Sequence, residues 1–451
     1  MKFSSIIGHV QHKFLIVLIF TATSVMAQQS SPYSRYGLGD MISLQSAVTK
    51  GMGNWSAAFQ SPYFMNLDNP ASFAFLRTTD FETGIYYNAS SLSDLNTTYN
   101  SDDGNINRLS IGFPLSRGKL DTTDKKKFHW GAGFGMVPTH RVFYNFQENH
   151  EDSVIGNYSS LYQGNGTLYQ YYLANGLSYT FEGDSTYHDL ALGVHTGFMF
   201  GQLAYSEALD FVDSLNYFDT RNVNSLSFNE LVWHMGFQYR LRFHKNADEG
   251  KWNKYEVTVG AFTQLASDHT ITFDNVWTRY DDNVLLDTLL FDENADSAAR
   301  LPMRFGVGFM FEKKRAWRIG ADYSFIKWSE LAIPLHHDVL NDQWRVALGG
   351  GITPDYNGDR YGEKIDYRLG FYYGNSNISI NGNTFDEYGL TLGFGLPVFY
   401  RKSLQLGMLN FSFELGQRGT TENNLIRENY LRSTLTFTLN DYKWFRKREI
   451  E

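Results

Sequence analysis

Charged side chains at alternate positions of short segments are the residues best placed to do chemistry in this chain. From Leu231 to Phe243 every odd position is large and apolar, whereas most even positions are His, Gly, Gln or Arg. Successive side chains of a strand point to opposite faces, so such a segment has one apolar face and one polar face. The polar faces of all such segments carry His195, His234, Arg240, Arg242, Glu256, Arg304, Arg318, Asp322, Arg345, Asp366, Arg368, Glu414 and Arg432.

These charges favour ion pairing over catalysis. Buried guanidinium and carboxylate groups need partners, so we expect Arg–carboxylate networks, either within this set or with another segment of the chain. A substrate site made from the same residues is the alternative interpretation. The formal charge of −9 and the pI near 5.8 argue against a nucleic-acid partner.

Motifs for enzymatic or metal chemistry are not found. The sequence has no His-Glu-x-x-His, no Gly-x-Ser-x-Gly, no Walker loop and no cysteine. The acidic stretch 272–301 offers oxygen ligands for Ca²⁺ but lacks glycine-punctuated spacing, and His336-His337-Asp338 is interpreted as solvated. We therefore predict no enzyme activity, no metal and no cofactor, while a Ser/His pair of the kind found in outer-membrane lipases remains an open alternative.

The elements that must position these charges are about fourteen segments with a period of two. An even count, aromatic residues at segment ends and alternating long and short connections are typical of a transmembrane β-barrel. The long polar connections are 89–106, 138–166, 204–225 and 272–301. The fold class predicted is all-β, a 14-stranded antiparallel transmembrane β-barrel, with strands at 80–88, 107–115, 128–137, 167–181, 189–203, 226–243, 255–271, 302–313, 317–328, 343–353, 364–374, 387–400, 404–416 and 429–439.

The N-terminus indicates export. Lys2 and Lys13 precede the apolar run Phe14–Phe20, and Val25-Met-Ala27 offers small residues for cleavage. The run is shorter than the ~20 residues of a membrane-spanning helix, so 1–27 is predicted to be a signal peptide. With the barrel pattern, this places the protein in the outer membrane of a Gram-negative bacterium, in contact with its lipids and with both termini periplasmic.

Two further parts flank the predicted barrel at 80–440. Residues 28–79 do not alternate, and Trp55, Phe59, Tyr63, Phe64 and Met65 are too apolar for a solvated arm, so we predict a plug in the lumen. Residues 441–451 form a basic periplasmic tail, which is either solvated or touches anionic lipid or a periplasmic protein.

The third predicted strand combines three glycines with a proline. Gly131, Gly133, Gly135 and Pro138 weaken a strand because glycine packs nothing and proline cannot donate to the ladder. They either leave room for the plug or produce a bulge that opens the wall. Both interpretations remain open from the sequence.

Several short motifs resemble the FadL/TodX family of outer-membrane barrels for hydrophobic compounds. They are Asn69-Pro70-Ala71, Gly164-Asn-Gly166, Ala321–Ser329 and Trp344–Gly349, in that order along most of 47–440. The resemblance implies a fourteen-stranded barrel with a hatch at Asn69-Pro70-Ala71 and sideways passage of apolar substrates at a kinked third strand. The start at 31–37 and the basic end at 441–448 depart from the familiar transporters.

Two functions follow as hypotheses. The first is a channel for passive uptake of a small hydrophobic ligand, which detergent could mimic, with release through the barrel wall. The second is a structural or accessory subunit of an outer-membrane assembly or secretion machine, bound to an outer-membrane or periplasmic protein. An apolar notch near the third strand would favour the channel, whereas a polar, sealed lumen would favour the subunit.

Overall fold

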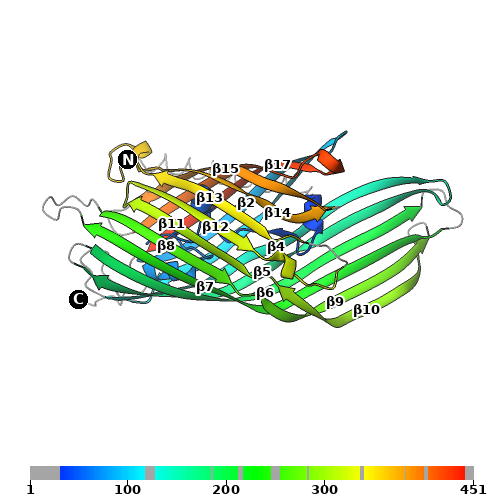
Figure 1. Cartoon of the computed structure of the whole chain (residues 1–451), viewed down its shortest axis with the longest axis horizontal. Helices are drawn as coiled ribbons and strands as arrows, with labels where there is room; N and C mark the ends of the chain where they lie inside the picture. The colour runs from blue at the N-terminus through cyan, green and yellow to red at the C-terminus, as the bar shows by residue number, and fades with distance from the viewer. Residues whose placement is uncertain are drawn as a thin grey trace, which may run out of the picture.

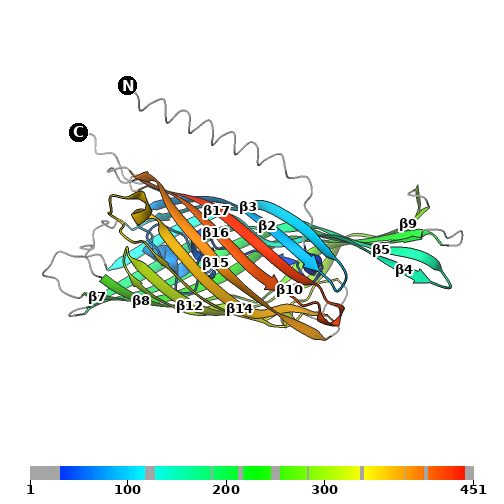
Figure 2. The same cartoon turned by 90° about the horizontal axis from the view of Figure 1, so that it is seen from above.

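The computed structural model is a long β-barrel built from antiparallel neighbours (Figures 1 and 2). It describes residues 31–116, 127–183, 186–211, 217–244, 254–281, 284–335, 340–380, 382–400 and 405–441. The predicted signal peptide, the His336-His337-Asp338 motif and residues 442–451 of the predicted tail lie outside the described residues. The barrel strands are β2 (Thr79–Ser93), β3 (Thr98–Pro114), β4 (Phe128–Asp152), β5 (Gly156–Glu182), β6 (Thr186–Phe211), β7 (Asp219–His244), β8 (Lys254–Gln264), β11 (Arg304–Lys313), β12 (Trp317–Ile326), β13 (Gln343–Ile352), β14 (Asp366–Ile380), β15 (Asn383–Tyr400), β16 (Gln405–Arg418) and β17 (Arg427–Asp441).

These fourteen strands close on themselves. β17 pairs with β2 from Asp441↔Thr79 to Arg427↔Ser93, and β8 pairs with β11 across the segment that separates them in sequence. Closure pairs the edges that an open sheet would leave exposed. The predicted fold class and strand number are thereby confirmed.

The expected strand at 255–271 and the expected loop at 272–301 are wrong. The chain instead forms β8, then β9 (Ser267–Asp281) and β10 (Val284–Leu301), and β9 pairs with the outer half of β7. The expected loops at 89–106, 138–166 and 204–225 are also mostly strand: the first belongs to β2 and β3, and the other two to the outer halves of β4 to β7. The outward positions of these outer halves are often polar, as at Asn145 and Gln163, and most of β10 is exposed, so the apolar period-two signal fades although backbone pairing continues.

A sheet therefore extends beyond one end of the barrel. We call it the protruding sheet: β4 from Arg141, β5 as far as Thr167, β6 from Gln202, β7 as far as Ser227, together with β9 and β10. Figure 2 shows β4, β5 and β9 running past the barrel end.

The outer wall of the barrel carries a belt of large apolar side chains. Phe237 and Phe309 are 38% and 44% exposed, and they face outward because their neighbours Gly236 and Gly308 lie against residues 57–71 inside the barrel. Phe134, Leu173 and Leu192 lie on the same face of neighbouring strands. Within the described ranges, no helix is both long and apolar enough to cross a membrane.

Residues 31–78, the N-terminal segment, lie inside the barrel. Its short pieces are η1 (Pro32–Arg35), β1 (Asp40–Met41), α2 (Ala47–Lys50) and η2 (Pro70–Phe75). The Ser46 hydroxyl caps α2 and the Asn69 amide oxygen caps η2, where Pro70 occupies the first turn. α2 lies against β15, β16 and β17, whereas η2 lies against β4 to β7, so the segment spans the lumen.

Candidate functional site

Glycines of the wall seat the backbone of the N-terminal segment. Gly131, Gly176, Gly193 and Gly236 are directly opposite one another on β4, β5, β6 and β7, and we call them the glycine row. A Cβ added at Gly193 would lie less than 3 Å from backbone atoms of Pro70 and Ala71. The chain can approach the wall this closely only where side chains are missing.

A second set of glycines performs the same task on other strands. Gly320, Gly349 and Gly370 are mutually paired on β12, β13 and β14. A Cβ at Gly320 would meet the Trp55 ring, and one at Gly349 or Gly370 would meet the Met52 backbone. The Trp55 end of the segment is therefore fitted to the wall as closely as the Pro70 end.

Asn69 bonds the N-terminal segment to the barrel ladder. Its Nδ2 donates to the carbonyl oxygens of Phe237 (3.1 Å), Ala261 (3.2 Å) and Ala57 (2.6 Å), while its Oδ1 accepts from the Ala71 amide. Phe237 and Ala261 are paired residues of β7 and β8. An amide can bind several carbonyls and still accept a bond, which explains why asparagine suits this position.

The predicted gate glycines lie beside the N-terminal segment and within a continuous ladder. Gly131 and Gly133 face Phe73, whereas Gly135 faces the backbone around Ser110. β3 and β4 pair without a break from Pro114↔Gly131 to Leu109↔Met136. The glycines leave space for the segment, and the pairing of β3 with β4 ends one residue beyond Gly135.

A seam opens in the wall where that ladder ends. A register shift at Pro138 in the β4–β5 pairing turns β4, and β3 outward of Leu109 pairs with β2 alone among the described strands. β1 occupies the edge of β4 instead: Asp40 lies opposite Arg141, and the Ile42 amide donates to the Thr139 carbonyl (2.8 Å). The N-terminal segment thus covers the seam from inside.

Outside this cover lies a cleft between β3 and the protruding sheet. Its cavity volume is about 580 Å³. Arg141 bridges the seam to Asp103 at 2.6 Å. The lining is rich in amide and hydroxyl groups, with Tyr99, Asn100, Ser101, Asp102, Asn145, Gln163, Asn165 and Ser206 among its members.

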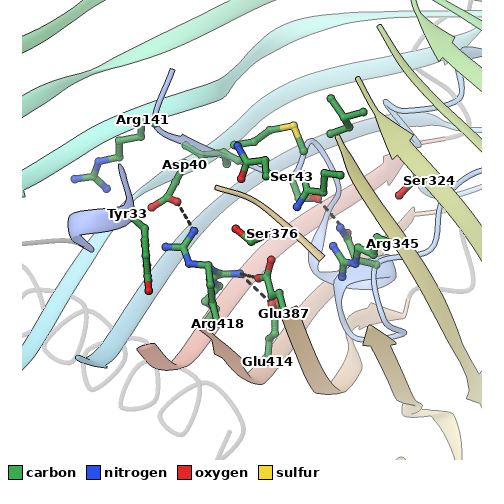
Figure 3. Close-up of a pocket in the computed structure, with 18 of the residues that line it drawn as sticks. Tyr33, Asp40, Ser43, Arg141, Ser324, Arg345, Ser376, Glu387, Glu414 and Arg418 are labelled. Atoms are coloured by element: carbon green, nitrogen blue, oxygen red, sulfur yellow. Dashed lines mark hydrogen bonds and ion pairs between the residues drawn. The ribbon is translucent and has the colours of Figure 1, made fainter. Parts of the chain in front are cut away.

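The lumen beside the N-terminal segment holds a charged cavity of about 230 Å³ (Figure 3). Arg418 lies between Asp40 and Glu428, with N–O distances of 2.7 Å to each. Six carboxylates and six cationic side chains line it: Asp40, Asp103, Asp322, Glu387, Glu414 and Glu428, with Lys50, Arg141, Arg304, Arg345, Arg418 and Arg432.

Lys50 at the end of α2 reaches this cavity. Burial lowers the pKa of its ammonium from 10.5 to about 8, Arg108 and Arg432 lower it further, and Glu414 acts in the opposite direction. A cavity in which twelve ionisable side chains converge binds water and ions in preference to an apolar molecule.

Many of the charged residues predicted for the lumen form arginine–carboxylate pairs. Asp189 accepts from Arg240 (2.8 Å) and Arg242 (2.9 Å), and Arg240 also lies 3.7 Å from Glu256. Asp366 pairs with Arg318 and Arg368, and Arg432 with Glu414.

Other predicted charges bind the N-terminal segment itself. Arg304 pairs with Asp68 at 2.9 Å, and Asp322 accepts from the Ser56 amide at 2.7 Å. Arg345 donates to the Gly53 carbonyl. His195 and His234 stack with ring centroids 4.6 Å apart and are fully buried.

The apolar residues predicted to form a plug are enclosed. Trp55, Phe59 and Phe64 are buried in one cluster, against which the half-buried Tyr63 packs, and Met65 is buried in a second cluster with Phe73. Trp55 and Phe59 make an edge-to-face contact with centroids 5.8 Å apart.

The sequence analysis missed several charges that complete the lumen networks. They are Asp68, Glu82, Asp103, Arg108, Arg141, Asp189, Arg418 and Glu428. Asp189 shares its odd phase with His195 on β6, so the alternation could have revealed it. Asp68 lies in a segment without periodicity and offered no such signal. Within the described ranges, no group of three or more His, Cys, Asp or Glu could hold a metal ion.

A family model named BamG matches residues 10–451. The chain belongs to the BamG family. Among curated proteins, none matches the sequence.

Solved structures show the same architecture. A Pseudomonas aeruginosa FadL homologue is 11% identical with a TM-score of 0.52, covering 89% of this chain and 99% of its own. The Pseudomonas putida toluene transporter TodX is 14% identical with a TM-score of 0.51, covering 90% of this chain and 100% of its own. These likenesses show that the chain has the outer-membrane barrel fold of the FadL/TodX type.

Proposed function

We propose that this protein is a non-transporting structural subunit of an outer-membrane assembly, the barrel serving as anchor and the protruding sheet as the surface presented to partners. The observation that carries the proposal is the occupied lumen. The N-terminal segment is seated against wall glycines, and the space left beside it is lined by charges. The family name, BamG, accords with such a role.

An apolar solute would find a poor path through this barrel. To pass, it would have to displace bonds such as those of Asn69 with the wall and then cross the ion pairs around Arg418. Leaving such groups without partners costs roughly 1–3 kcal/mol each. A passive channel cannot repay that cost, whereas a scaffold gains rigidity from the same bonds.

The decisive experiment measures flux. The barrel is reconstituted in liposomes, and entry of a fluorescent fatty acid and ion conductance are compared with protein-free vesicles. We expect neither to exceed the background. Deletion of residues 31–78 should produce conductance, which shows that the wild-type barrel was inserted and occluded. Flux through the wild type would reject the proposal.

The orientation proposed places the protruding sheet outside the cell and both termini in the periplasm. Because the chain has no cysteine, single cysteines report topology without background. Asn96→Cys, in the β2–β3 turn, should react with an impermeant maleimide on intact cells. Ala316→Cys, in the β11–β12 turn, should react only after permeabilisation.

A lateral passage for hydrophobic molecules is the second candidate, and the seam between β3 and β4 is the observation that favours it. Where β1 covers the seam, Met41 of β1 is paired with His140 of β4. If the seam conducts, a disulfide between Met41→Cys and His140→Cys should abolish uptake that each single variant retains. Equal uptake in the reduced and oxidised double variant would remove this candidate.

A further inference from the structure

The outer part of β10 is an apolar edge strand in the protruding sheet. Its register is set by β9 alone among the described strands, from Leu301↔Ser267 at the base to Val284↔Asp281 at the tip. The opposite side makes one isolated bridge, Arg300↔Ala332, close to the barrel. Every residue from Val284 to Asn294 is exposed.

This edge displays more apolar surface than an isolated strand tolerates in water. Val284 and Phe291 are 65% and 66% exposed, and four leucines between them are at least 41% exposed: Leu285, Leu286, Leu289 and Leu290. Three register shifts interrupt the pairing of β10 with β9. Long apolar edges invite pairing with another strand, and native proteins usually block them with lysine or proline. Residues 284–299 contain neither.

The charges on this edge all have one sign. Asp287, Asp292, Glu293 and Asp296 are acidic, and the first basic residue of the strand is Arg300 at its base. Asp287 lies 3.7 Å from Arg279 of β9, an exposed and distant pair. Like charges opposite one another destabilise strand pairing, so two copies of this edge would repel.

Lipid does not suit this position. The ladder of β10 runs outward from the barrel rim for a distance of roughly 50 Å at strand spacing. Figure 1 shows β9 and β10 at the end of the molecule that extends past the barrel, and Figure 2 shows β9 there as well. The occupant must therefore be found in water.

We propose that β10 accepts an extended strand of a protein partner whose side chains alternate between apolar and basic. The backbone of that strand would continue the protruding sheet, its apolar side chains would cover the leucines, and its cations would pair with Asp287 and Asp292. This inference rests on the proposed structural role, because it names the class of partner that the subunit would hold.

Peptide binding to the purified barrel tests the inference. The probe is a short fluorescent peptide that alternates valine and lysine. It is compared with a valine–glutamate peptide and with a valine–lysine peptide N-methylated on consecutive residues, so that neither edge can pair. We expect the first to bind at least about tenfold more tightly than the other two. Equal binding of the N-methylated peptide would overturn strand pairing.

Matched charge variants locate the site. Asp287→Lys/Asp292→Lys should abolish the preference for the basic peptide. Glu148→Lys/Glu151→Lys makes the same change in charge on β4, at exposed positions of the same sheet, and should preserve it. Loss of the preference in both variants would show that the peptide responds to the net negative charge of the sheet, and it would reject β10 as the binding site.

Two outcomes separate this inference from the proposed function. Light scattering that shows a dimer dependent on β10 would assign the edge to a second copy and overturn the partner proposed here. Flux through liposomes, measured without any peptide, bears only on the structural role. Peptide binding in a barrel that conducts would therefore leave the edge site intact while rejecting that role.

Discussion

The barrel and the protruding sheet are built from the same strands in two environments. In the barrel half of β4 to β7, outward side chains such as Phe134, Leu173 and Phe237 are large and apolar. In the protruding half, the paired outward positions Asn145 and Gln163 are amides. Strand pairing continues through the change, so the surroundings of a strand, and not its hydrogen bonding, determine its side chains.

The inner faces differ as well. In the barrel half the glycine row presents almost no side chain, because the backbone of the N-terminal segment lies against it. Near the rim the inner face is filled by its own large residues, including Val142, Leu203 and Phe228, in one apolar cluster. One half is therefore shaped to receive the backbone of another segment, whereas near the rim the side chains of the wall supply most of the core, with Leu38 of the N-terminal segment among them.

The largest expected effect concerns the glycine row. Gly193→Leu places a branched side chain against the backbones of Pro70 and Ala71, with atoms that cannot rotate away. We expect a loss of at least about 3 kcal/mol in stability and exposure of the N-terminal segment to protease. Gly362→Leu is the control, because its Cβ meets nothing closer than 3.8 Å. If the N-terminal segment of Gly193→Leu were as resistant to protease as that of the wild type, the close contact between this segment and the glycine row would be refuted.

A change of the same side chain in both regions sharpens the contrast. Phe237→Arg should lower barrel stability by roughly 2–4 kcal/mol, because it places a cation on the apolar belt. Phe291→Arg, on the exposed edge of β10, should leave urea unfolding of the barrel unchanged. Equal losses of stability in the two variants would show that the apolar belt and the edge of β10 lie in the same environment.

Lys50 predicts a pH dependence for the occupied lumen. Its folded pKa of about 8 lies below the unfolded value of 10.5, so between these values the unfolded chain binds more protons. Stability should rise with pH across that window, by on the order of 2 kcal/mol, and the penalty should be complete below pH 8. The difference between wild type and Lys50→Met in denaturant unfolding isolates this contribution. A flat difference would contradict burial of the ammonium.

The smallest expected effect lies at the base of the protruding sheet. The Nη1 of Arg300 donates to both carboxylate oxygens of Asp268, at 2.8 and 3.0 Å, and both side chains are exposed. Asp268→Asn should leave the stability unchanged within experimental error, because solvent screens the pair. A larger loss, measured by thermal unfolding, would mean that this end is less hydrated than its exposure indicates.

Much of the barrel was predictable because each strand of a closed wall must alternate apolar side chains toward lipid with small or polar side chains toward the lumen. The alternation of Trp233, Met235 and Phe237 with His234 and Gly236 determines which face is outward, and the structure confirms that phase. The fourteen strands followed from counting such segments. The strands β9 and β10 of the protruding sheet could not be counted in this way, because their side chains do not alternate between an apolar and a polar face.

The candidate site was predictable in its residue types but not in its contacts. Asn69-Pro70-Ala71 and the glycines of β4 attracted attention through local chemistry. That Asn69 bonds to the ladder at Phe237 and Ala261, and that Gly193 and Gly236 complete the row, depends on strand register. Register arises from pairing residues far apart in sequence.

The sequence by itself determined an all-β barrel, its lipid-facing phase, its strand number and an enclosed apolar segment before the first strand. Only the tertiary structure decided that Arg304 meets Asp68, that β1 covers the seam beside Arg141, and that the outer part of β10 pairs with β9 alone among the described strands. The physical reason is the range of each constraint. Side-chain periodicity is local and can be read along the chain. Closure of the barrel, the contacts of the N-terminal segment with the wall and the exposed edge of β10 depend on which distant segments become neighbours.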